Sequence, residues 1–237
     1  MVMEMETQKT RQEYIQQLAE VQDKVYQMGL MAEVAVRRSL KALLENDADL
    51  AEKVMEADDA IDKKIEEIED DCILLIAKQQ PIAHDLRVIA TGFKISTDIE
   101  RIGDHAFDIA RTAKEEGGLL DDERKALIRE LGDCAVEMVS RAMEAYRAAD
   151  IHMADEVRHM DRKMDDIFNR TFYSLSHFVT DESKRVEDAT RLLFVARFLE
   201  RIGDHAVNIA EWVVYLETAE RIHTKKIRHV HAMQEEK

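Results

Sequence analysis

One short segment of this chain occurs twice. The heptapeptide Glu-Arg-Ile-Gly-Asp-His-Ala at residues 100–106 returns letter for letter at residues 200–206. The similarity extends upstream, where Gly29 corresponds to Gly132. A block of this length, repeated at a fixed distance, indicates an internal duplication. We therefore expect two similar halves that meet near residues 117–118.

The composition favours helices in both halves. The 237 residues include one proline and seven glycines, fewer than the tight turns of a β-rich fold require. Apolar residues recur every three or four positions, as in Ile102, Ala106 and Ile109, which is the spacing of a helix face. The expected helices cover residues 10–46, 47–79, 82–115, 121–149, 150–179 and 183–220.

These helices predict an all-α fold of two tandem three-helix bundles. The first bundle would occupy residues 1–117 and the second residues 118–220, with a tail at 221–237. Asp47 and Asp150 are expected to cap the helices that follow them. Pro81 is expected to interrupt the chain between the second and third helices.

Charge and cysteine content narrow the classes of function. The formal net charge of −16 disfavours binding to nucleic acid and to anionic lipid. No apolar run is long enough to cross a bilayer, so direct membrane insertion is not expected. Cys72 and Cys134 both fall within helical patterns, which suits a reducing compartment. We expect a cytoplasmic protein.

Pairs of carboxylates spaced four residues apart fall on four of the expected helices. The pairs are Asp58/Asp62, Glu100/Asp104, Asp161/Asp165 and Glu200/Asp204. In an antiparallel helical hairpin, residues equally distant from the turn lie level with each other. Pro81 stands midway between Asp62 and Glu100, and also midway between Asp58 and Asp104. Each hairpin is therefore expected to bring two carboxylate pairs together.

Four converging carboxylates repel one another unless cations or protons neutralise them. Clustered oxygen ligands suit hard cations such as Mg²⁺, Ca²⁺, Mn²⁺ or iron. Ion pairing with arginines such as Arg101 and Arg201 is the alternative, and spacing alone leaves both open. A helical wheel directs the acids of 100–108 away from the apolar face, so we expect a site open to solvent. His105 and His205 are interpreted as surface histidines, and the alternative is that they support the metal ligands from outside the cluster.

A carboxylate-bridged iron enzyme is a second alternative. The patterns Glu156-x-x-His159 and Glu220-x-x-His223 match half of a di-iron motif, but they are not equivalent in the repeat. A di-iron oxidase also directs its ligands into the bundle core. The sequence contains no glycine-rich phosphate loop, nucleophile elbow or Cys-x-x-Cys motif. The outward direction of the acids and the unmatched positions of the two patterns argue against this alternative.

The duplicated heptapeptide, the acidic pairs and the segment Gln-Pro-Ile-Ala-His-Asp-Leu-Arg at residues 80–87 together resemble the PhoU family of bacterial phosphate-uptake regulators. The resemblance covers about residues 10–220. It implies two three-helix bundles without enzymatic activity, which negatively regulate the phosphate-starvation response. It also implies a homodimer that links the ATPase of a phosphate ABC transporter to a membrane sensor histidine kinase.

The resemblance further implies multinuclear metal clusters, often of iron, at the acidic motifs. Carried over by position, one cluster would use Asp58, Asp62, Glu100, Asp104 and Asp108, and the other Asp161, Asp165, Glu200 and Asp204. The chain departs from the pattern at Asn208, which stands where Asp108 has a carboxylate. Its second half also lacks the proline-containing turn. Equal occupancy of the two sites is therefore not expected.

Overall fold

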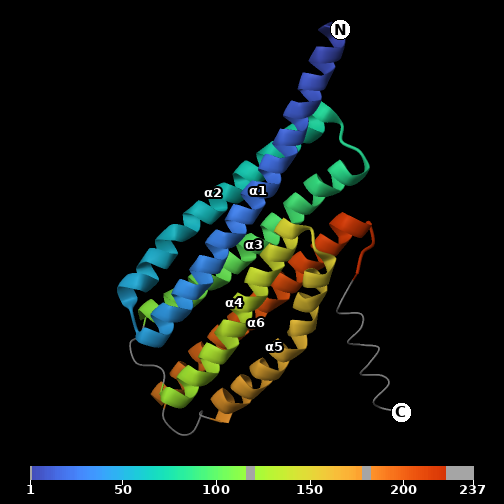
Figure 1. The fold of residues 1–237 in the computed structure, drawn as a ribbon. Coiled ribbons are helices and arrows are strands. Elements are labelled where there is room, and N and C mark those ends of the chain that lie inside the picture. The colour runs from blue at the N-terminus through green and yellow to red at the C-terminus, as the bar shows by residue number, and fades with distance from the viewer. Residues whose placement is uncertain (1, 116–120, 178–182, 223–237) are drawn as a thin grey trace, which may run out of the picture.

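The computed structural model describes residues 2–115, 121–177 and 183–222, and these residues form an all-α fold. Its helices are α1 (Val2–Glu45), α2 (Ala48–Gln79), α3 (Ala83–Glu115), α4 (Asp122–Ala148), α5 (Ile151–His177) and α6 (Ser183–Thr218). The first three helices and the last three form two tandem three-helix bundles, which lie side by side (Figure 1). The predicted fold class is therefore confirmed. The exact domain boundaries stay a prediction.

The first helix differs from its predicted bounds, because α1 begins at Val2 and not near residue 10. The first ten residues include three Met and two Glu, which favour helix intrinsically. Helix propensity and continuation from the packed part of α1 together extend the helix past the bundle, as Figure 1 shows.

Aspartate caps begin helices at the predicted places. The Asp47 side chain accepts a hydrogen bond from the Leu50 amide at the start of α2. Asp150 accepts hydrogen bonds from the amides of His152 and Met153 at the start of α5. The predicted break at residues 117–118 and most of the predicted turn at 180–183 lie outside the described residues.

The two bundles pack against each other through α1 on α4 and α3 on α6. The contacts are related by an approximate twofold axis. A Cβ atom added to Gly29 would lie 2.4 Å from Cε of Met143, and one added to Gly132 would lie 2.4 Å from Cδ2 of Leu40. These are equivalent positions of the repeat, so the glycines let α1 and α4 approach closely twice.

The core is apolar and continuous between the halves. Fully buried isoleucines on α3, including Ile95, Ile99 and Ile102, pack with buried residues of α6 such as Leu199 and Ile202. The Nε of Arg87, at the start of α3, donates a hydrogen bond to the Leu216 carbonyl near the end of α6. None of the helices, over their described residues, is both long and apolar enough to span a membrane.

Candidate functional site: two acidic clusters and a cleft between the repeats

The first acidic cluster forms between α2 and α3, where the sequence predicted it. Burial raises the pKa of Asp58 to about 6, and the negative charges of Asp62 and Asp104 add to the rise. Asp59 and Glu100 act in the same direction. Burial followed by Asp104 also raises the pKa of Glu100. The carboxylates of the two helices are therefore close enough to repel one another.

Gly103 allows this close approach. A Cβ atom at Gly103 would lie 3.1 Å from Cδ1 of Ile61 and 3.3 Å from Oδ1 of Asp58. An alanine would therefore crowd the α2 side chains that face α3. Gly203 is the equivalent position in the second half, where an added Cβ atom would lie 3.0 Å from Cε of Met164.

Arginines pair with the α3 acids of the first cluster. Arg101 lies 3.3 Å from Glu100 and 2.9 Å from Asp104, and Arg111 lies 2.8 Å from Asp108. Burial, opposed by Arg111, raises the pKa of Asp108. The α3 side of the cluster is thus partly neutralised by ion pairs. On α2, the charges of four other carboxylates act on Asp58 and raise its pKa, in addition to burial.

The second cluster lies between α5 and α6 and is more enclosed. Asp161 is only 5% exposed, whereas the acidic site of each hairpin was expected to be open to solvent. Glu200 pairs with Arg197 at 2.8 Å through Oε1, while its buried Oε2 has no hydrogen-bond partner. Burial and the charge of Asp204 raise the pKa of Glu200, and Asp165 adds to this.

A metal fits these residues chemically in two respects. Burial and, after it, the neighbouring negative charges raise the pKa of Asp58, and the Oε2 of Glu200 is a buried acceptor without a donor. Within the described residues, no group of three or more His, Cys, Asp or Glu side chains is arranged to hold a metal ion as it stands. The predicted metal ligands therefore stay a prediction.

The di-iron patterns do not form a site in the described residues. Glu156 pairs with Arg141 on α4 at 2.8 Å. The Nδ1 of His159 lies 2.7 Å from the carbonyl oxygen of Asp155, in the preceding turn of its own helix. His223, of the second pattern, lies outside the described residues. Glu156 and His159 therefore each have a partner within the protein and need no shared metal ion.

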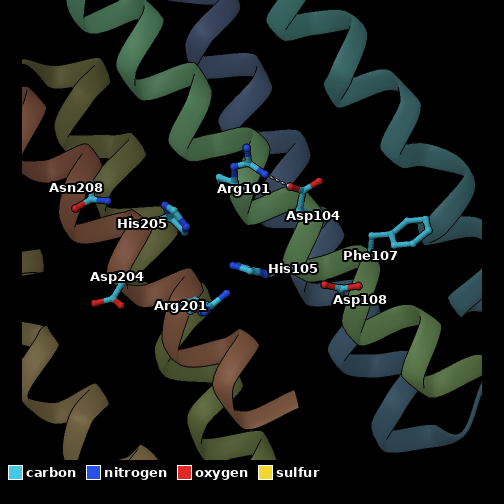
Figure 2. A pocket seen from close by; sticks show the side chains of 9 residues that line it. All are labelled: Arg101, Asp104, His105, Phe107, Asp108, Arg201, Asp204, His205 and Asn208. Atoms are coloured by element: carbon cyan, nitrogen blue, oxygen red, sulfur yellow. Dashed lines mark hydrogen bonds and ion pairs between the residues drawn. The ribbon is translucent and has the colours of Figure 1, made fainter. Parts of the chain in front are cut away.

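A cleft of about 470 Å³ opens between α3 and α6, next to the approximate twofold axis. Figure 2 shows the side chains that line it from both helices. They are Arg101, Asp104, His105, Phe107, Asp108, Arg201, Asp204, His205 and Asn208. Eight of these nine lining positions form four matched pairs of the repeat, at 101/201, 104/204, 105/205 and 108/208.

The two histidines of the cleft have different partners. The Nδ1 of His205 lies 2.8 Å from Oδ1 of Asp98, which also accepts a hydrogen bond from Asn208 at 3.0 Å. His105 instead stacks on Phe198, with ring centroids 5.5 Å apart. Phe198 is the repeat counterpart of Asp98. The two copies of the heptapeptide therefore sit in unlike surroundings.

His105 is buried, and its interpretation as a surface histidine is wrong. It is 8% exposed, and its Nδ1 has no hydrogen-bond partner among the described residues. Burial, followed by the positive charges of His205 and Arg201, lowers the pKa of His105 to about 4. The single-helix wheel could not show this, because α6 of the other half covers the residue.

Sequence reasoning also missed Asp98. The available signal was the exchange of Asp98 for Phe198 at one position of an otherwise well-preserved repeat. The comparison of the two halves looked for identical residues, and position 98/198 differs between them.

Known proteins resemble this chain over most of its length. The model of the PhoU domain matches twice, at residues 25–113 and 128–213. The phosphate-specific transport system accessory protein PhoU homolog of Clostridium acetobutylicum is 37% identical over 90% of this chain and 98% of that protein. The homolog of Pseudomonas aeruginosa is 34% identical over 86% of this chain and 85% of that protein.

Solved structures agree with these sequence matches. The crystal structure of PhoU from Pseudomonas aeruginosa superposes with a TM-score of 0.83 at 32% identity, covering 87% of this chain and all of that one. The phosphate transport system regulatory protein PhoU from Streptococcus pneumoniae gives 0.81 at 25% identity, covering 89% and 99%. These relatives are named as accessory or regulatory proteins and not as enzymes. The chain therefore belongs to the PhoU family.

Proposed function

We propose that this chain is a cytoplasmic negative regulator of phosphate uptake and of the phosphate-starvation response. It acts without catalysis, as a homodimeric adaptor between the ATPase of a phosphate ABC transporter and a membrane sensor histidine kinase. The observation that carries the proposal is the match of the PhoU domain to both halves of the chain. The names of its relatives, accessory proteins of the phosphate-specific transport system, support the same role.

Deletion of the gene tests the regulatory role. Transcripts of the high-affinity phosphate transporter are measured in phosphate-replete medium, with and without a plasmid-borne copy of the gene. We expect the deletion strain to express these transcripts at high phosphate and the plasmid to restore repression. Normal repression in the deletion strain would show that the chain is not a negative regulator.

The adaptor role needs a separate measurement. A tagged copy of the protein, expressed at its native level, is recovered from cells grown in high phosphate, and the co-purifying proteins are identified. The proposal expects the transporter ATPase and the sensor kinase in the same fraction. Recovery of neither partner, from cells that contain both, would contradict it. Sedimentation of the purified protein tests the homodimer in the same preparation.

We also propose that the two acidic clusters hold metal ions, with iron the first candidate. The first set of ligands would be Asp58, Asp62, Glu100, Asp104 and Asp108, and the second Asp161, Asp165, Glu200 and Asp204. Bound cations would neutralise the carboxylates that now repel one another around Asp58. Two observations support this, namely the raised pKa of Asp58 and the buried Oε2 of Glu200 without a donor.

A metal-free protein is the alternative that a specific observation favours. Arg101 and Arg111 pair with the α3 acids, and Arg197 pairs with Glu200. These ion pairs partly neutralise both clusters without any cation. Metal content must therefore be measured directly.

The metal test compares two double variants of equal charge. Asp62→Asn with Glu100→Gln changes the first cluster, whereas Glu66→Gln with Asp70→Asn changes an exposed pair of the same spacing on α2. The proteins are purified without chelator, loaded with iron or manganese and analysed for bound metal. We expect the first variant to lose bound metal and the second to retain it. Equal metal content in both variants, or none in the wild type, would reject the metal clusters.

A further inference from the structure

Exposed apolar side chains gather where α2 meets α3. Ile73 and Ile76 on α2, Ile82 in the turn and Leu86 on α3 are between 42% and 77% exposed. They lie at the end of the molecule from which α1 projects (Figure 1). A single exposed apolar residue is ordinary on a protein surface, but several neighbouring ones indicate a contact surface for a partner. We call these four residues the tip surface.

The register of the two helices makes these residues neighbours. The thiol of Cys72 on α2 donates to the Ile89 carbonyl oxygen on α3, with Sγ 3.9 Å from the oxygen. Because antiparallel helices rise equally per residue, Ile76, one turn beyond Cys72, is level with Leu86, about one turn before Ile89. The other two residues stand within about one turn of this level. The tip surface is therefore one patch that both helices form.

Ile76 and Leu86 also point in the same direction as residues that face each other further along the two helices. Asp58 faces α3, since its Oδ1 lies 3.3 Å from the position that a Cβ atom of Gly103 would occupy. Ile76 follows Asp58 by 18 residues, and Leu86 precedes Asp104 by 18. Because 18 residues make about five turns of an α-helix, each apolar residue shares the direction of its acidic counterpart. Both apolar side chains therefore line the seam between α2 and α3.

Two glutamates continue the patch along α2. Glu66 precedes Ile73 by seven residues and Glu69 precedes Ile76 by seven, so the acidic and apolar side chains share one face of the helix. Glu66 is exposed and Glu69 is half-buried. Neither forms a hydrogen bond or an ion pair with another described residue. The face thus presents two negative charges about two turns away from its apolar side chains.

The second half of the chain has a related arrangement. Val186, the counterpart of Leu86 in the repeat, is exposed on α6. Phe172 on α5 is exposed too, and it follows Asp165 of the second acidic cluster by seven residues. An apolar surface therefore adjoins an acidic one on both hairpins. Burial in a core accounts for neither surface, and the structure describes every residue of the first.

Charge and shape decide the kind of partner. A second copy of this chain carries the same net charge of −16 and the same two glutamates, so two tip surfaces placed together repel each other. Anionic lipid is disfavoured in the same way. The described residues form helices and leave no strand edge to extend, so a partner segment packs here as helix on helix. From Glu66 to Ile76 the face is about 15 Å long, or about three turns.

We propose that the tip surface binds an amphipathic helix of another protein. Apolar residues of that helix cover Ile73, Ile76 and Leu86. Its lysines or arginines, about two turns along, pair with Glu66 and Glu69. Burial of apolar area supplies most of the affinity, and the charges fix the direction in which the helix lies. The partner is therefore recognised by a basic stretch and an apolar stretch on a single helix face.

This inference deepens the proposed adaptor role and rests on it, because an adaptor needs a surface that a partner occupies. The two can fail separately. Repression of transporter transcripts in the deletion strain tests regulation, whereas crosslinking at position 76 tests docking.

Site-specific photo-crosslinking in living cells tests the tip surface directly. The full-length protein, expressed at its native level in the deletion strain, carries Ile76→benzoylphenylalanine, which ultraviolet light joins to the molecule that covers it. A second protein carries the same change at Leu30, an exposed apolar residue of α1. Mass spectrometry identifies the crosslinked peptide and measures its yield.

We expect position 76, and not position 30, to crosslink to a protein other than this one. The crosslinked segment should have apolar residues at helical spacing and lysine or arginine within about two turns. Glu66→Gln with Glu69→Gln should lower the yield about two- to tenfold, as the loss of two exposed ion pairs predicts. Asp133→Asn with Glu144→Gln, at exposed acids of α4, should leave the yield unchanged.

The apolar side chains have their own pair of variants. In the protein with the photoreactive residue at position 76, Leu86→Ser should lower the yield at least about fivefold, because it truncates a side chain at the centre of the contact. Val34→Ser, at an equally exposed apolar residue of α1, should have no effect.

A product with a second copy of the chain, with the chain's own residues 223–237, or with a segment that lacks lysine and arginine would overturn the proposal. So would a yield at position 76 no higher than at position 30, or a yield that the two glutamates do not affect. The substituted residues are exposed or half-buried, and thermal unfolding of each variant verifies that it folds. A crosslinked partner other than the transporter ATPase or the sensor kinase would support docking and count against the adaptor role.

Discussion

The Nδ1 of His205 lies 2.8 Å from Oδ1 of Asp98, across the interface between the two halves of the chain. The equivalent contact on the other side of the approximate twofold axis is a stack of His105 on Phe198. One half of the interface is thus polar and the other aromatic. The contact with Asp98 also includes Asn208, so a single carboxylate holds two side chains of α6.

Replacing Asp98 is expected to weaken the contact between the halves. Asp98→Ala leaves His205 and Asn208 without their shared acceptor, which predicts a loss of about 1–3 kcal/mol in the free energy of unfolding. Denaturation by urea measures the loss. Asp133→Ala, at an exposed site on α4, is the control and is expected to change stability by less than about 0.5 kcal/mol. Equal effects of the two variants would contradict this role for Asp98.

Two glycine substitutions are expected to change stability in opposite directions. In Gly132→Ala the new Cβ would meet Leu40 at 2.4 Å, and such overpacking predicts a loss of about 1–3 kcal/mol. In Gly92→Ala the closest atom, Sγ of Cys72, lies at an ordinary 3.5 Å, so the better helix propensity of alanine predicts a gain of up to about 1 kcal/mol. Thermal unfolding of both variants tests the close approach of α1 and α4. A stabilised Gly132→Ala would disprove it.

Removal of one acid from the first cluster is expected to have opposite effects without and with metal. In chelator-treated protein, Asp62→Asn relieves the repulsion that acts on Asp58 and should raise the midpoint of thermal unfolding. In the presence of a bound metal the same variant loses a ligand and should be stabilised less than the wild type. Asp70→Asn, on the same helix, should respond to metal as the wild type does. A metal response that is identical in all three proteins would exclude Asp62 as a ligand.

The first cluster also predicts a pH dependence of stability. The pKa of Asp58 is about 6 in the folded protein, above its usual 3.8, so the folded protein holds this proton more tightly than the unfolded chain. Its contribution to the free energy of unfolding is therefore greatest at low pH and falls as the pH rises from about 4 to about 6. Asp58→Asn should remove that fall, a difference on the order of 1 kcal/mol after allowance for solvent screening.

Urea denaturation of chelator-treated wild type and Asp58→Asn, at pH 4, 5, 6 and 7, measures the difference. The free energy of unfolding of Asp58→Asn should rise relative to that of the wild type between about pH 4 and about pH 6, and the difference should stay constant above about pH 6. A constant difference between the two proteins across all four pH values would show that Asp58 does not titrate as described.

Several features of the fold follow from local sequence. The helix caps at Asp47 and Asp150 use side chains that bond amides two or three residues away, so the sequence alone specifies them. The level placement of Asp62 and Glu100 also follows from the turn at Pro81, because both helices rise equally per residue. The influence of Asp62 on the pKa of Glu100 agrees with that placement.

The burial of His105 and Asp161 did not follow from local sequence. A helical wheel treats one helix at a time, and His105 is covered by side chains of α6 from the other half. The contact of His105 with Phe198 joins residues from different halves of the chain, whose docking the apolar periodicity does not specify. The cleft between α3 and α6 was missed for the same reason.

The approximate twofold axis between α3 and α6 has the geometry of a homodimer interface held within one polypeptide. In a true homodimer, a substitution at the axis appears on both subunits, so every contact there is made twice. Fusion of the copies removes that restriction. The chain could place Asp98 on one side and Phe198 on the other, and so commit one histidine to structure while the other stays available. Duplication followed by fusion thus lets the two equivalent positions of this interface carry different side chains and different contacts.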